Sequence, residues 1–167
     1  NDAGGNYAGR AYVFYGGASP DTTADLVLTG AVAEDSFGWS VAGAGDVNDD
    51  GYDDVLVGAR NSDTGGLNAG AAYVYFGGPS ADAVADLTVV GAEAYGYFGS
   101  SVAGAGDVNA DGCADVIVGA GWQQGGGGYY GGKAYVYHGG SAADTTADLV
   151  LVGEAAGDNF GAAVGAA

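Results

Sequence analysis

An internal repeat of about 60 residues constrains the fold of this chain more than any other feature. Three short markers each occur three times, and their copies are separated by 61 and then 62 residues. The copies are residues 11–13, 72–74 and 134–136 (Ala-Tyr-Val), residues 24–26, 85–87 and 147–149 (Ala-Asp-Leu), and residues 37–38, 98–99 and 160–161 (Phe-Gly). Because independent markers share one period, the chain is an array of a single supersecondary module.

Each unit contains short apolar runs that alternate with clusters of Gly, Asp, Asn and Ser. The runs in one unit are residues 40–44, 54–58, 71–76 and 86–90, and they are rich in Val, Tyr and Leu. This pattern predicts β-strands, and the 36 glycines of the chain argue against long helices. Four strands form a small antiparallel sheet that must pack on its neighbours, either radially as in a β-propeller or in a stacked or side-by-side array.

The phase of the repeat divides the chain into four parts. Residues 1–30 hold the last two strands of a unit, 31–91 and 92–153 are complete units, and 154–167 hold the first strand of another. A closed propeller has about 4–8 blades, so 167 residues are too few to close a ring. The chain is then either a fragment of a longer protein, which we favour, or a protomer that completes its sheets with other copies.

The charge of the chain excludes several classes of partner. With 21 acidic and 3 basic residues the formal net charge is −18, which argues against binding to nucleic acid or to anionic lipid. No apolar stretch approaches the ~20 residues of a membrane span, so we expect no membrane insertion. The single cysteine, Cys113, forms no internal disulfide and does not fix the compartment.

One motif carries the chemistry. Residues 46–54 and 107–115 share the pattern D-x-N-x-D-G-x-x-D, which places side-chain oxygens at positions 1, 3, 5 and 9 and a glycine at the turn. Ca²⁺ takes six to eight oxygen ligands, including backbone carbonyls. The predicted ligands are Asp46, Asn48, Asp50, the carbonyl of Tyr52 and Asp54 in the first loop, and Asp107, Asn109, Asp111, the carbonyl of Cys113 and Asp115 in the second. An Asp/Asn-rich turn without metal is the alternative, but two copies with identical spacing weigh against it.

Other metals and other calcium loops fit the motif less well. Mg²⁺ prefers a tighter octahedral shell that keeps several waters, and no His or thiolate converges here for Zn²⁺. An EF-hand needs a bidentate Glu at position 12, where this chain has Val57 or Val118 inside a predicted strand. The motif therefore predicts two structural Ca²⁺ sites, each in a strand–loop–strand hairpin.

Residues 37–59 and 98–120, with a further start at 160–166, closely resemble the FG-GAP repeat of integrin α-subunit β-propellers and their bacterial relatives. The resemblance covers essentially the whole chain and implies partial β-propeller blades, in which the calcium loop joins the first and second strands. It also implies that ligands bind on the opposite face, through the loops between the second and third strands and between blades. Where the family usually has Gly-Ala-Pro, this chain has Gly58-Ala59-Arg60 and Gly119-Ala120-Gly121.

The loops of that opposite face are residues 60–70 and 121–132 within units and 31–36, 92–97 and 154–159 between them. The loop 121–132 differs most from its counterpart, so we expect Trp122, Tyr129 and Tyr130 to bind a protein or glycan ligand. Packing over a sheet edge is the alternative for these aromatics, and for Tyr95 and Tyr97. Glu34, Glu93 and Glu154 are interpreted as solvated acids in preference to a further cation site.

Nothing in the sequence predicts catalysis. His138 takes the place of an aromatic residue at a strand end, and Cys113 stands at a variable calcium-loop position. We therefore expect a non-catalytic, calcium-stabilised scaffold for adhesion or ligand binding, located extracellularly or at the cell surface, where calcium is millimolar. The alternatives are a self-assembling oligomer or filament built through incomplete terminal sheets, and an accessory domain of a secreted hydrolase.

Overall fold

The structure is a computed structural model that describes residues 5–16, 21–126, 128–141 and 143–166. Residues 1–4 and 17–20 of the predicted unit 1–30, and Ala167 of the predicted unit 154–167, lie outside the described residues. The described part of the chain forms ten strands and no helix. The strands are β1 (Arg10–Val13), β2 (Leu26–Thr29), β3 (Phe37–Gly45), β4 (Asp54–Ala59), β5 (Ala71–Tyr75), β6 (Leu87–Val90), β7 (Ser101–Gly106), β8 (Asp115–Ala120), β9 (Lys133–Tyr137) and β10 (Leu149–Val152).

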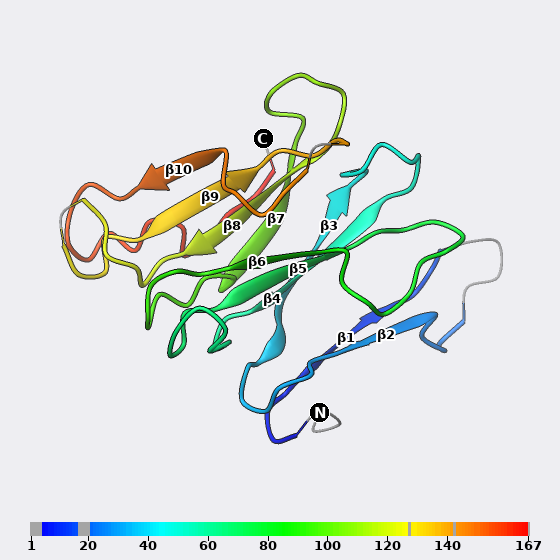
Figure 1. Cartoon of the computed structure of the whole chain (residues 1–167), viewed down its shortest axis with the longest axis horizontal. Coiled ribbons are helices and arrows are strands. Elements are labelled where there is room, and N and C mark those ends of the chain that lie inside the picture. The colour runs from blue at the N-terminus through cyan, green and yellow to red at the C-terminus, as the bar shows by residue number, and fades with distance from the viewer. Residues whose placement is uncertain (1–4, 17–20, 127, 142, 167) are drawn as a thin grey trace.

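Two four-stranded antiparallel sheets and one two-stranded sheet make up the fold (Figure 1). The sheets β3-β4-β5-β6 and β7-β8-β9-β10 are meanders in which spatial order follows chain order, and β1 pairs with β2. These sheets are partial β-propeller blades, so the predicted all-β fold class is confirmed. No helix in the described residues is long and apolar enough to cross a lipid bilayer.

Successive blades pack closely because glycines line their contact. The innermost strands β3 and β7 lie against each other, and Ser40 Oγ donates to the carbonyl of Gly99 at 2.8 Å. A Cβ on Gly58 would lie only 2.1 Å from the Gly99 carbonyl oxygen. The core between the two blades is built from buried aliphatic side chains, among them Leu56, Val74 and Val118, together with the rings of Phe98 and Tyr137.

The Phe-Gly marker forms the junction between units. The backbone N–H of Phe37 donates to Ala8 at 2.9 Å, that of Phe98 to Ala69 at 2.9 Å, and that of Phe160 to Gly131 at 3.0 Å. The glycine that follows has a positive φ of 79–81° in each copy, which a glycine adopts without strain. The Phe98 ring then packs on two tyrosines of its own blade, with centroids 5.3 Å from Tyr135 and 6.4 Å from Tyr137.

The last predicted strand does not form. Phe160 makes the junction and a parallel bridge to Gly132, but the described residues 161–166 are not in a strand. A strand needs a hydrogen-bonded partner, and the 167 residues contain no second strand for this unit. Phe160 is accordingly 42% exposed, whereas its counterpart Phe98 is 1% exposed.

Candidate functional site

The first predicted calcium loop connects β3 to β4 and is held by its own side chains. Asp46 accepts the backbone N–H of Asp50 through Oδ1 at 3.0 Å and that of Gly51 through Oδ2 at 2.8 Å. Asn48 Oδ1 accepts the same Asp50 N–H at 3.1 Å. The oxygens at positions 1 and 3 therefore converge on one amide inside the turn.

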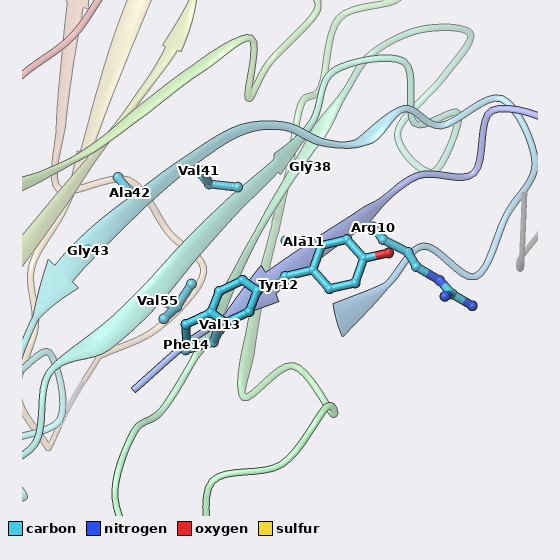
Figure 2. Close-up of a pocket in the computed structure, with 10 residues that line it drawn as sticks. All are labelled: Arg10, Ala11, Tyr12, Val13, Phe14, Gly38, Val41, Ala42, Gly43 and Val55. Carbon is cyan, nitrogen blue, oxygen red and sulfur yellow. The ribbon is translucent and has the colours of Figure 1, made fainter. Parts of the chain in front are cut away.

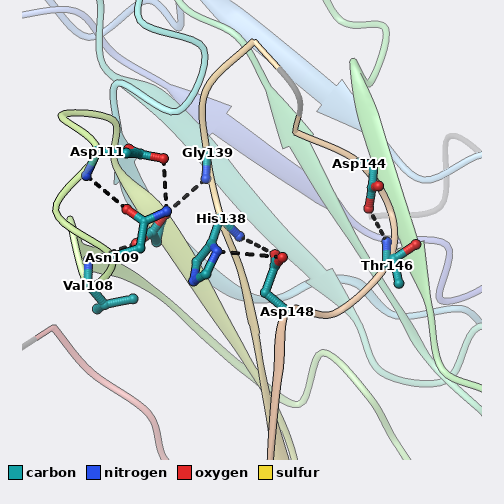
Figure 3. A network of polar contacts seen from close by, with 9 residues as sticks. Val108, Asn109, Asp111, His138, Gly139, Asp144, Thr146 and Asp148 are labelled. Atoms are coloured by element: carbon teal, nitrogen blue, oxygen red, sulfur yellow. Dashed lines mark hydrogen bonds and ion pairs between the residues drawn. The ribbon is translucent and has the colours of Figure 1, made fainter.

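The second loop, between β7 and β8, repeats this geometry, and Figure 3 shows the part of it that joins Asn109 to Asp111. The N–H of Asp111 donates to Asp107 Oδ1 and to Asn109 Oδ1, both at 3.0 Å, and Gly112 donates to Asp107 Oδ2 at 2.9 Å. The Asn109 side-chain amide donates to Asp111 Oδ2 at 2.8 Å. The two loops, which occupy equivalent positions of the repeat, thus adopt one conformation, and the motif side chains make the same contacts in both.

The backbone of both loops enters the left-handed region twice. Gly51 has a φ of 89° and Gly112 a φ of 97°, which explains the glycine at position 6. Position 4 is also left-handed, with a φ of 59° at Asp49 and 61° at Ala110. Asp tolerates this conformation better than Ala does, so the second loop carries strain that the first largely avoids.

Position 9 of the motif is buried and anchors the loop to the sheet. Asp54 Oδ2 accepts the N–H of Val47 at 2.8 Å, and Oδ1 accepts the N–H of Gly77 at 2.8 Å. Asp115 makes the same pair of contacts in the next blade, with Val108 at 2.7 Å and Gly139 at 2.9 Å.

The environment of Asp54 shows that the loop carboxylates gather. Burial raises the pKa of Asp54, the amides of Gly77 and Val47 oppose that rise, and the nearby charges of Asp50 and Asp46 add to it. Three carboxylates of one motif are thus close enough to repel one another. A cation among them would relieve this repulsion.

The donor set of each loop fits Ca²⁺ in type and spacing. As they stand, the described residues form no group of three or more His, Cys, Asp or Glu side chains arranged to hold a metal ion, because the loop carboxylates face backbone N–H groups. A carboxylate oxygen has two lone pairs, so an amide contact leaves it able to bind a cation as well. The residues offer oxygen ligands alone, as a hard cation requires.

Cys113 belongs to the second loop, and His138 lies at the end of β9, where it contacts Asp148. The His138 backbone N–H donates to Asp148 Oδ2 at 2.8 Å, and its Nδ1 is 3.5 Å from Asp148 Oδ1 (Figure 3). Asp25 and Asp86 accept backbone N–H groups in the same way, so this aspartate role explains the Ala-Asp-Leu marker. Burial, followed by the charge of Asp111, raises the pKa of the Cys113 thiol and makes it a poorer nucleophile.

A continuous row of aromatic rings lies on the face opposite the calcium loops. The Trp122 ring meets Tyr97 and Tyr130 edge-to-face, with centroids 5.8 and 5.6 Å apart. Arg60 extends the row, since its guanidinium carbon lies 3.5 Å from the centroid of the Trp39 ring and 5.6 Å from that of Tyr97. We call Trp39, Arg60, Tyr97, Trp122 and Tyr130 the aromatic row.

Trp122 is the centre of the aromatic row and stays 50% exposed. A hollow of about 120 Å³ lined by Arg60 and Tyr97 lies on one side of it, and one of about 370 Å³ lined by Tyr130 and Asn159 on the other. Tyr129, also predicted to bind ligand, is exposed. Trp39 and Arg60 were not among the predicted ligand-binding residues, although Arg60 stands where the family usually has proline.

The three loop glutamates differ from one another. Glu34 and Glu154 are exposed, as expected for solvated acids. Glu93 instead forms an ion pair with Lys133 and accepts the N–H of Gln124 at 3.3 Å. Glu93 therefore contacts both ends of the loop that carries Trp122, through Gln124 near its start and Lys133 just after its end.

An apolar groove of about 500 Å³ lies between β1 and β3 (Figure 2). Val41 in this groove is 58% exposed, whereas its counterpart Val102 in the next blade is 7% exposed because β3 covers it. Among the described strands, β1 pairs only with β2, whereas its equivalent β5 in the first complete blade pairs with β6 on one side and with β4 on the other. The groove is therefore the position that an additional inner strand would fill.

The repeated four-stranded blades and their hairpin loops define the class of β-propeller repeat proteins. Comparison with known proteins agrees with this class. The FG-GAP repeat model matches residues 37–75 and 98–137. The chain contains two FG-GAP repeats and is similar to integrin α subunits.

Several curated integrin subunits are similar over much of the chain. Rat integrin alpha-7 is 35% identical over 160 residues, or 91% of this chain. Integrin alpha-5 of Xenopus laevis is 37% identical over 117 residues, or 67% of this chain, and mouse integrin alpha-8 is 36% identical over 129 residues, or 72%. The chain spans only 13%, 11% and 12% of these relatives, respectively.

Proposed function

We propose that this chain is a calcium-stabilised, non-catalytic propeller scaffold for extracellular adhesion or ligand binding. The observation that carries the proposal is the paired geometry of the loops 46–54 and 107–115, whose oxygens converge identically in two blades. Ca²⁺ at each loop would neutralise carboxylates that otherwise repel, and would stiffen the hairpin. An extracellular or cell-surface location is proposed because calcium is millimolar there, which matches the affinity of known extracellular calcium modules.

Thermal melting with and without calcium tests the metal. We expect excess chelator to lower the melting temperature and calcium to restore it. Asp46→Asn with Asp107→Asn should remove most of the calcium response, while Asp82→Asn with Asp144→Asn, outside both loops, should preserve it. A melt that is unchanged by chelator contradicts the calcium proposal.

The aromatic row is the proposed ligand-binding surface, together with the exposed Tyr129. Its exposed rings and flanking hollows offer flat apolar contacts of the kind that bind protein side chains or sugar rings. Trp122→Ala and Tyr130→Ala should weaken capture of a partner from a panel of glycans and matrix proteins, with Tyr52→Ala on the opposite face as control. Equal binding by all three variants contradicts this assignment.

A non-catalytic role is supported by the surroundings of the reactive side chains. The His138 ring lies beside Asp148 at a strand end, and burial and acidic neighbours disfavour the Cys113 thiolate. If the chain instead serves as an accessory domain of a secreted hydrolase, it should bind that enzyme's substrate without cleaving it. Pull-down and product assays on the same polymer distinguish these roles.

Self-association is a second candidate function, which the groove beside β1 favours. A strand of a second copy with the sequence of β4 would pair with β1 as β4 pairs with β5, and the β3 strand of that copy would then cover Val41 as β3 covers Val102. Light scattering should then show a discrete multimer, and Val41→Lys should return it to a monomer. A monomer at all concentrations contradicts self-association. We further propose that the units divide after residues 30, 91 and 153, as the period of the repeat indicates.

A further inference from the structure

We propose that a partly enclosed cavity between the β1-β2 sheet and the first complete blade binds a small organic ammonium ion, with the Asp35 carboxylate as its counter-ion. This site is separate from the calcium loops and from the aromatic row. It does not depend on the proposed scaffold function.

The cavity has a volume of about 220 Å³ and combines one acid with hydroxyl and aromatic groups. Its lining includes Asp35, Thr64, Tyr73, Tyr75 and Phe37. At about 30 Å³ per water molecule, the space holds about seven waters. It therefore suits a ligand of several non-hydrogen atoms.

Asp35 is 8% exposed and lacks a basic partner. Ser62 is its hydrogen-bond partner, and the charge of Asp63, which is also negative, acts to raise the pKa of Asp35 further. Within the described residues, Lys133 pairs with Glu93 and Arg60 covers Trp39, and no ion pair involves Asp35. Burial raises the pKa of Asp35, as expected for an acid without a counter-ion.

Hydroxyl groups hold this carboxylate in place. The buried Ser62 hydroxyl is the hydrogen-bond partner of Asp35 and of the Tyr73 hydroxyl, and it lies 3.0 Å from Thr64 Oγ1. The acid is therefore fixed at the cavity wall and does not turn out to solvent.

The next blade shows what the same position looks like when it is filled. Gln123 stands where Ser62 stands, since Gly132 donates to its carbonyl at 3.0 Å as Gly70 donates to that of Ser62 at 2.9 Å. The Gln123 side chain is buried and accepts a hydrogen bond from Tyr135, the counterpart of Tyr73. Gly96 replaces Asp35, and a Cβ there would lie 2.7 Å from Gln123 Cγ. Between the β1-β2 sheet and the first complete blade, the space that Gln123 fills in the next blade is therefore a cavity, and Asp35 lies at its wall.

Charge and aromatic walls select an ammonium ion over other ligands. An anion would meet Asp35 and Asp63, and an apolar molecule would leave the buried carboxylate without compensation. The Phe37 and Tyr73 rings, with centroids 5.5 Å apart, and the Tyr75 ring, 6.3 Å from Phe37, border the space. Aromatic faces beside a carboxylate attract alkylammonium groups through cation–π and ionic contacts.

Calorimetry and thermal melting with n-butylammonium test the proposal, at saturating calcium and about 0.15 M NaCl so that the loops are filled and surface attraction is screened. We expect a saturable rise in melting temperature and a binding isotherm for the wild type. Asp35→Asn should weaken binding at least tenfold, and Glu34→Gln, an exposed neighbour with the same change of charge, should not. n-Butanol, the neutral ligand of equal size, should bind at least tenfold more weakly.

A second variant separates ligand binding from folding. Asp35→Gly with Ser62→Gln copies the arrangement of the next blade, so it should fold with a normal melt and lose the n-butylammonium response. No response in the wild type, a response that survives in either variant, or equal binding of n-butanol would overturn the proposal. Complete competition by additional Na⁺ or Ca²⁺ at equal ionic strength would also overturn it, because it would define an inorganic cation site.

Discussion

The Asp54 carboxylate and the Gly77 backbone amide are 23 residues apart in sequence and are joined by a 2.8 Å hydrogen bond. The other oxygen of Asp54 holds the amide of Val47, so one buried side chain fixes the loop to the chain that leaves β5. The repeat preserves this pair of contacts in Asp115. Position 9 of the motif therefore has a structural role apart from any cation.

Asp54→Asn should destabilise the fold even without calcium, because the new NH₂ group would face a backbone N–H. Hydrogen bonds to a charged group contribute about 1.5–3 kcal/mol each. We expect the free energy of unfolding to fall by about 2 kcal/mol, which for a chain of this length lowers the melting temperature by about 4–8 °C.

The control is Asp53→Asn, an exposed neighbour with the same change of charge. Melting both variants in chelator isolates the hydrogen bonds from calcium binding. Equal melting temperatures for the two variants would show that the buried contacts add nothing to stability.

Asp35 makes the stability of the chain depend on pH in a defined direction. Burial and, to a lesser degree, the charge of Asp63 raise its folded-state pKa above 3.8, while Ser62 opposes the rise. A raised pKa in the folded state means that its stabilising contribution is present below pH 3.8 and is lost as the pH rises through the folded value. Asp35→Asn removes this loss, so at neutral pH and without amines the variant should melt at a higher temperature than the wild type.

The measurement is the difference in melting temperature between variant and wild type from pH 3 to pH 7. The difference should grow with pH for Asp35→Asn and stay flat for Glu34→Gln. A constant difference, or one that favours the wild type at neutral pH, would exclude a buried unpaired charge at Asp35.

Features encoded within one unit could be predicted from the sequence. The strands and both loops follow from local alternation and spacing, and the predicted runs 54–58 and 71–76 match β4 and β5 to within one residue. The predicted first strand of the last unit was wrong, because strand pairing depends on a partner that these 167 residues do not supply.

Contacts between units could not be predicted in the same way. The Phe-Gly marker reveals a period, but only the structure shows that Phe98 joins its unit to Ala69 of the one before. Arg60 on Trp39, and Asp35 beside Ser62, pair residues from different loops. Nothing in their spacing distinguishes them from exposed loop residues, because the contact depends on how the blades pack.

Ala110→Asn should stabilise the second loop. Ala110 has a φ of 61°, a conformation that costs most residues about 1–2 kcal/mol and that Asn adopts more readily. We expect a gain of about 0.5–1 kcal/mol, or about 1–4 °C in melting temperature. Ala155→Asn, in an exposed loop without a positive φ, is the control. A gain at both positions, or at neither, would mean that backbone strain at Ala110 does not limit stability.

The close packing of blades predicts opposite results for two glycines of one sheet. A Cβ at Gly58 would lie 2.1 Å from the Gly99 carbonyl oxygen, whereas one at Gly43 would have no atom within 4 Å. Neither residue has a positive φ, so the comparison isolates contact from backbone strain. Gly58→Ala should force the blades apart and cost about 3 kcal/mol, while Gly43→Ala should be neutral or stabilising by up to about 1 kcal/mol. Denaturant melts of the two variants measure the difference, and similar midpoints would mean that the blade contact yields to a methyl group.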